Sequence, residues 1–205
     1  MARARRVNRS EPLDVPVAQE AVARGVLAVA ARSGWAGVTP AAVARAAKVP
    51  EASVTRLAQD RIALLRVVGD QIDAQIDDVI TSEENQAGAS AKDQLFEVLM
   101  ARFDILQADR AGYTALIDGV FADPCAVTAS ARPVLASMAR VVRAARGQGL
   151  GATNRRVFDT PKVIIISIVY LAVLRVWLND QSPDLTATMA ALDRRLGQAA
   201  AFFGE

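Results

Sequence analysis

Apolar residues recur at helical spacing from the first third of the chain to its end. Near the start they lie three or four positions apart, which predicts an amphipathic helix over residues 14–32. The apolar stripe of this helix consists of Val15, Ala18, Val22, Val26 and Val29. Ser33 and Gly34 follow, and glycine is favoured just beyond a helix end, so the helix is predicted to stop there.

Two short helices are predicted after this first one. Thr39 is a favourable N-cap residue and Pro40 suits the first helical position, which predicts a helix over residues 40–47. A tight turn at residues 48–50 then leads into a second short helix over residues 51–58. Two short helices joined by a tight turn, after a longer helix, form the helix-turn-helix arrangement, whose second helix enters a DNA major groove.

The rest of the chain predicts a larger helical body. Polar or glycine-rich connections are expected at residues 81–91 and 147–151. The helices are predicted over residues 61–80, 92–107, 111–121, 124–146, 160–179 and 182–203, with Asp60 capping the first and Ser182–Pro183 starting the last. No segment has a credible strand pattern, so the predicted fold class is all-α with about nine helices.

Basic residues gather at the N-terminal end. Residues 1–61 hold ten basic and five acidic side chains, although the whole chain has a net charge of only +2. Residues 1–13 form a basic arm that is predicted to be disordered, and its cations are Arg3, Arg5, Arg6 and Arg9. This asymmetry fits a polyanionic partner at one end of the molecule, and it fits a solubilising tail equally well.

Histidine is absent and Cys125 is the only cysteine, which removes several classes of chemistry. Serine–histidine and cysteine–histidine catalysis and the usual zinc sites need residues that the chain lacks. We therefore expect no enzyme activity, metal or cofactor, and one cysteine without an internal partner suits the reducing cytoplasm. The most apolar run, residues 163–174, is shorter than the about 20 residues of a membrane span, so a buried core helix is expected instead.

The helix-turn-helix segment resembles the opening of TetR-type transcriptional regulators. That family carries a stretch reading roughly Thr-x-x-x-Ile-Ala-x-x-Ala-Gly-Val-Ser, followed by Leu-Tyr, Phe, Lys and Leu-Leu at fixed spacing. The chain matches this stretch without gaps, in identity or type, at Thr39, Val43, Ala44, Ala47, Val49, Val54, Leu64 and Leu65. Ser53 lies where a small hydroxyl residue is usual, and the resemblance covers about residues 15–76.

The resemblance implies a helix-turn-helix head over residues 14–61 and a ligand-binding and dimerisation body over residues 62–205. It implies operator DNA as a partner, a homodimer through the last two helices, and control by a small apolar ligand. Arg61 replaces a lysine that usually contacts phosphate. Together with the basic arm, the expected DNA-binding residues are Arg3, Arg5, Arg6, Arg9, Thr39, Glu51, Ser53, Thr55, Arg56 and Arg61.

The recognition segment departs from the family pattern at several positions. Lys48 stands in place of the turn glycine, Pro50 in place of the capping serine, and Leu57 where histidine is frequent. At the two positions where the family has aromatic residues, the chain has Thr55 and Ala58. Because DNA affinity depends on cations that neutralise phosphates, these changes leave open a second interpretation, in which the fold persists without DNA binding.

Polar residues inside apolar helices are candidates for a ligand pocket, which combines apolar walls with a few polar anchors. They are Asp104, Tyr113, Asp118, Ser167, Tyr170 and Trp177. The other interpretation is that these groups pair with each other in a core. In addition, residues 176–184 and 192–196 resemble the closing helices of the lipid-binding accessory protein family of ubiquinone biosynthesis, which shares the TetR-like fold. A lipid-binding accessory protein is therefore the alternative function.

Overall fold

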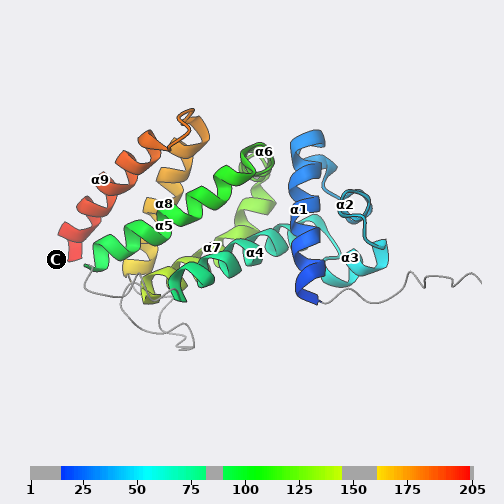
Figure 1. Ribbon diagram of the computed structural model, residues 1–205, viewed down its shortest axis with the longest axis horizontal. Helices are drawn as coiled ribbons and strands as arrows, with labels where there is room; N and C mark the ends of the chain where they lie inside the picture. The colour runs from blue at the N-terminus through cyan, green and yellow to red at the C-terminus, as the bar shows by residue number, and fades with distance from the viewer. Residues whose placement is uncertain (1–14, 82–89, 145–160, 204–205) are drawn as a thin grey trace, which may run out of the picture.

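The computed structural model describes residues 15–81, 90–144 and 161–203, and the predicted all-α class is confirmed for them (Figure 1). They form nine α-helices and one short 3-10 helix. The elements are α1 (Val15–Ser33), η1 (Trp35–Gly37), α2 (Pro40–Ala47), α3 (Glu51–Leu57), α4 (Arg61–Thr81), α5 (Ala91–Ala108), α6 (Arg110–Phe121), α7 (Pro124–Ala144), α8 (Pro161–Asn179) and α9 (Thr186–Phe203). The basic arm and the two predicted connections, apart from their edges, lie outside the described residues.

Helices α1 to α3, called the head below, surround a small apolar core. Val22 and Val26 of α1, Val43 of α2 and Val54 of α3 are completely buried there. Gly25 allows α2 to approach α1 closely, because a Cβ atom at this position would lie 3.0 Å from the Ala47 Cβ. The short helices are thus held by apolar packing against α1, which short helices need because they are marginal in isolation.

Helices α4 to α9, called the body below, extend away from the head. The head lies at one end of the molecule and α9 at the other (Figure 1). Helix α6 packs against α1 and η1 through two glycines. A Cβ at Gly112 would lie 2.8 Å from the Leu27 Cβ, and one at Gly119 would lie 2.2 Å from the Trp35 Cβ. Only glycine permits this approach, so α6 forms a close joint between body and head.

The predicted start of the last helix was wrong. Helix α9 begins at Thr186, four residues after Ser182, and Leu185 before it adopts a left-handed conformation with φ 54°. Asp180 organises this turn, since its carboxylate accepts hydrogen bonds from the backbone N–H groups of Ser182 and Thr188 at 3.0 and 2.8 Å. Burial opposes ionisation of Asp180, but these bonds hold the pKa of its carboxyl below the usual range.

Helix α8 has a buried face and an apolar exposed face. Val163, Val173 and Trp177 are completely buried against the body. At 19 residues and a mean hydropathy of 1.9, the whole helix is long and apolar enough to cross a membrane, which the shorter run at residues 163–174 had not indicated. Within the body, 44% of this apolar window is buried, and the rest lies on the exposed face.

Candidate functional site

The helix-turn-helix is formed by α2, a tight turn and α3. Thr39 caps α2 as predicted, because its Oγ1 accepts a hydrogen bond from the Ala42 backbone N–H at 3.2 Å. Lys48 takes the left-handed conformation that ends α2, with φ 56°. The Val49 N–H then donates to the Ala44 carbonyl over 3.1 Å, which closes the turn. The turn therefore forms although lysine replaces the usual glycine.

Helix α3, the second helix of this motif, presents a polar outer face. Val54 and Ala58 are buried, as the inward positions predicted, with exposed fractions of 0% and 1%. Glu51, Thr55 and Arg56 are exposed. The remaining predicted DNA-binding residues of this region are the exposed Thr39 and the half-buried Ser53, while Arg3, Arg5, Arg6 and Arg9 lie outside the described residues. Pro50 precedes α3 and makes no side-chain capping bond.

Arg61, predicted as a phosphate contact, lies at the junction of head and body. Its Nη2 is 3.1 Å from Oδ2 of Asp123, which precedes α7. The Trp35 indole N–H donates to the same oxygen over 3.0 Å. The Arg61 guanidinium also lies 5.3 Å from the centroid of the Trp35 ring. Arg61 thus contacts Asp123 and Trp35 within the chain, although 46% of its side chain is exposed.

An open groove of about 540 Å³ lies beside the N-terminal end of α2. It is lined by the exposed cations Arg32 and Arg45, the hydroxyl residues Ser33 and Thr39, and apolar residues of α1 and α2. Among the described ion pairs, none involves Arg32, Arg45 or Arg56. Arg45 donates through its Nε to the Ala41 carbonyl at 3.3 Å, and all three cations are exposed to solvent.

The body contains a buried polar network centred on Arg102. Arg102 on α5 is 6% exposed and donates to Asp73 on α4, Ser137 on α7 and Tyr170 on α8, over 2.8, 3.0 and 3.2 Å. Burial alone disfavours the charged guanidinium, but Tyr170 and Asp73 hold the pKa of Arg102 above its usual value. Arg140 of α7 adds ion pairs to Asp73 and Asp77. Four helices of the body are thus joined through one cation.

The six predicted pocket residues separate into interior and surface groups. Tyr113, Ser167, Tyr170 and Trp177 are buried. Asp104 and Asp118 are both exposed and do not join them. The Ser167 hydroxyl donates to the Val163 carbonyl of its own helix at 2.7 Å. Burial, reinforced by Asp109, raises the pKa of Tyr113 to about 12, so this phenol stays neutral at physiological pH.

Trp177 has an indole N–H that donates no hydrogen bond to the described residues. Its side chain is completely buried, and its indole Nε1 has no hydrogen-bond partner there. The Arg110 guanidinium stacks 4.8 Å from the Trp177 ring centroid and donates to the Trp177 and Leu178 carbonyls at 2.9 and 3.3 Å. Arg110 thereby ties the start of α6 to the end of α8.

Sequence reasoning missed Arg102, Ser137 and Asp123. A signal for Arg102 was present, because it lies seven residues after Leu95 on the apolar stripe that includes Leu99 and Leu106. A charged residue at such a position is rarely buried without a partner. For Asp123, the following Pro124 indicated a helix start, but nothing local pointed to its contacts with the distant Trp35 and Arg61.

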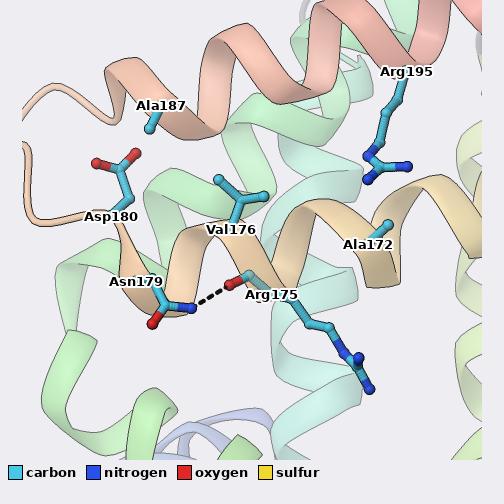
Figure 2. A pocket seen from close by; sticks show the side chains of 7 residues that line it. All are labelled: Ala172, Arg175, Val176, Asn179, Asp180, Ala187 and Arg195. Atoms are coloured by element: carbon cyan, nitrogen blue, oxygen red, sulfur yellow. Dashed lines mark hydrogen bonds between the residues drawn. The ribbon is translucent and has the colours of Figure 1, made fainter.

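A second groove, of about 630 Å³, lies between α8 and α9 (Figure 2). Arg195 of α9 extends across it toward Ala172 of α8, and its Nε is buried without a partner among the described residues. Arg175 points away from the groove and places its guanidinium 5.8 Å from the Phe121 ring. Helix α8 also exposes Ile168 beyond this groove, with 60% of its surface accessible.

Comparison with solved structures identifies the fold. A TetR transcriptional regulator from Nitrosomonas europaea ATCC 19718 matches with a TM-score of 0.70 and 18% identity, covering 89% of this chain and 98% of that one. The chain therefore has a TetR-like fold. A TetR regulator from Rhodococcus sp. RHA1 matches with a TM-score of 0.62 and 17% identity, covering 94% and 100%.

Two further comparisons add to this result. The fatty acid degradation regulator FadR from Bacillus halodurans matches with a TM-score of 0.61 and 14% identity, covering 92% of this chain and 96% of that one. The model of the COQ9 family matches residues 162–203, which form α8 and α9. This match lies where the sequence resembles the ubiquinone-biosynthesis accessory family. No curated protein sequence matches the chain.

Proposed function

We propose that this protein is a TetR-like transcriptional regulator that binds operator DNA as a homodimer in the cytoplasm and responds to a small apolar ligand. The observation that carries the proposal is the formed helix-turn-helix, whose recognition helix buries Val54 and exposes Glu51, Thr55 and Arg56. Exposed polar side chains on a helix of this kind can reach base edges in a major groove. The cations near α2 would neutralise phosphates on either side.

Dimerisation would use α8 and α9. Among the described side chains, α8 exposes the large apolar residues Ile164, Ile168 and Leu171, and α9 exposes Met189, at 38–60%. Contiguous exposed apolar surface marks an interaction site, and two such helix pairs can form a four-helix bundle around a twofold axis. The dimer would hold two heads for half-sites about 34–36 Å apart.

The ligand would act on the polar network of the body. Tyr170 and Arg102 connect α8 and α5 to Asp73 of α4, and α4 begins beside the head. A ligand that separates these helices would change the position of α4, and with it the fit of the heads to DNA. The buried Tyr113, Ser167 and Trp177 provide apolar surface with polar anchors in the same interior.

A gel-shift titration with the DNA upstream of the protein's own gene, at moderate salt, tests this function. Thr55→Ala and Arg56→Ala should each weaken specific binding by roughly 1–3 kcal/mol if they read bases. Arg132→Ala is the matched control, since it removes an exposed arginine from α7, outside the head. Failure of the wild type to retain any operator tested would contradict the regulator.

A lipid-binding accessory function is the alternative that one observation favours. The COQ9 family match covers α8 and α9, and α8 carries the exposed apolar residues Ile164 and Ile168. Solvent extraction of the purified protein, followed by mass spectrometry, distinguishes the two functions. A stoichiometric isoprenoid or acyl lipid in a protein that binds no DNA would support the accessory function, whereas specific DNA binding lost in Arg56→Ala would support the regulator.

A further inference from the structure

Both carboxylate oxygens of Asp123 are bound at the junction of head and body. Oδ2 accepts from the Trp35 indole N–H at 3.0 Å and lies 3.1 Å from Arg61 Nη2. Oδ1 accepts from the backbone N–H groups of Cys125 and Ala126, at 3.0 and 3.2 Å. One oxygen is therefore bound to the head and the first residue of α4, while the other is bound to the first turn of α7.

We propose that Asp123 is a positioning residue for DNA recognition, and that Arg61 acts through Asp123 and Trp35 and makes no phosphate contact of its own. This inference rests on the proposed DNA-binding function. It assigns Arg61 a role different from the one that the family resemblance implies. Each of the three side chains contacts the other two, because the Arg61 guanidinium also lies 5.3 Å from the Trp35 ring centroid.

The position of this junction explains how it would orient the recognition helix. Trp35 is 6% exposed and packs closely against Gly119, where a Cβ atom would lie 2.2 Å from the Trp35 Cβ. Arg61 is the first residue of α4, and only residues 58–60 separate it from the end of α3. A displacement of Arg61 relative to Asp123 would therefore move α3 relative to the body, and with it the spacing of the two heads in a dimer.

The electrostatics favour an internal role for Arg61. The Trp35 hydrogen bond, the Ala126 N–H and the Arg61 charge together lower the pKa of the Asp123 carboxyl, although desolvation opposes them, so it is ionised at neutral pH. A phosphate approaching Arg61 would meet a guanidinium whose charge Asp123 already offsets and whose ring-facing side Trp35 covers. Arg56, which forms none of the described ion pairs, has no such competitor.

Salt-dependent DNA binding of Arg61→Ala, Asp123→Asn and the double variant tests the proposal. Asparagine keeps the shape of the side chain and is itself a good N-cap for α7. We expect each single variant to weaken binding by roughly tenfold, the double variant to be no weaker than either, and the salt slope to stay unchanged. Tighter binding by Asp123→Asn, with a shallower salt slope for Arg61→Ala, would overturn the proposal and restore the phosphate contact.

A second measurement separates this proposal from the proposed function. Spin labels at Arg45→Cys on α2 and Arg132→Cys on α7, in a Cys125→Ala background, report the head–body distance without DNA. Both labelled positions are exposed. Asp123→Asn should broaden or shift the distance distribution, and an unchanged distribution would overturn the positioning role. If the wild type binds no DNA, the proposed function fails by that result alone, and the spin-label distances still decide whether Asp123 orients the head.

Discussion

Arg102 on α5 donates a hydrogen bond to Asp73 on α4 over 2.8 Å, and both side chains are largely enclosed, with 8% and 16% of their surfaces accessible. The Ser137 hydroxyl donates to the same Asp73 oxygen, so the carboxylate holds two donors in the interior. A buried ion pair of this kind adds little net stability over an apolar replacement of both residues, because both charges have lost their water. Its stability effect depends on whether one partner or both are replaced.

Removal of Arg102 alone should destabilise the fold strongly. Arg102→Met would leave the Asp73 charge enclosed with only the partial compensation of Ser137 and Arg140, at a cost of about 3 kcal/mol. The double variant Arg102→Met with Asp73→Leu should recover most of this loss, since it removes both charges and keeps the volume apolar. Urea unfolding measures both. Equal stability of the single and double variants would show that the unpaired Asp73 charge does not cause the loss of stability.

The pH dependence of stability should contain a contribution from Asp180. Its folded pKa is depressed by hydrogen bonds from Ser182 and Thr188, which outweigh the opposing effect of burial. The stabilisation is therefore present above the unfolded pKa of about 3.9 and is lost as pH falls toward the folded pKa. Asp180→Asn should lower stability at pH 7 and flatten the curve below about pH 5. Thermal melts between pH 7 and pH 3 test this, and parallel curves for variant and wild type would contradict it.

Two glycines on different helices of the body should respond in opposite directions to alanine. A Cβ at Gly119 of α6 would meet the Trp35 Cβ at 2.2 Å, so Gly119→Ala should force η1 away from α6 and destabilise the protein by roughly 1–3 kcal/mol. A Cβ at Gly69 of α4 would meet nothing within 4 Å, and Gly69→Ala should stabilise by about 1 kcal/mol through helix propensity. Melting temperatures that rise in both variants would show that the α6 joint tolerates separation.

Much of the fold was predictable because its signals are local. The cap residues Thr39 and Asp60 were predicted, and both accept the expected backbone hydrogen bonds, from Ala42 and Ala63. Helical spacing placed Val54 and Ala58 on the buried side of α3. The error at α9 has a local cause as well. Ser182 and Pro183 form a favourable helix start, but the Asp180 carboxylate accepts hydrogen bonds from the Ser182 and Thr188 amides, and the helix begins only at Thr186.

The candidate site was less predictable because its contacts cross long stretches of sequence. Asp123 reaches Trp35 across 88 residues, and Arg102 reaches Tyr170 across 68. Neither pairing follows from spacing within a helix. The same limit explains why polar residues among apolar neighbours separated into buried ones, such as Tyr170, and exposed ones, such as Asp104. Periodicity assigns a residue to a helix, but tertiary packing decides which side of that helix meets the core.

The exposed face of α8 provides the sharpest test of the proposed dimer. Ile168 is 60% exposed and lies between Ile164 and Leu171, so no packing among the described residues covers these three large apolar side chains. Ile168→Glu should leave the fold intact, since most of this side chain lies outside the core. In a dimer it should place two negative charges near the twofold axis, where they repel each other. Sedimentation equilibrium at micromolar concentration should then report a monomer for Ile168→Glu and a dimer for the wild type.

Val127→Glu on α7 is the matched control, because Val127 is also exposed, at 42%, but lies on a different helix. The control should remain dimeric. A wild-type monomer, or a dimer unaffected by Ile168→Glu, would contradict assembly through α8.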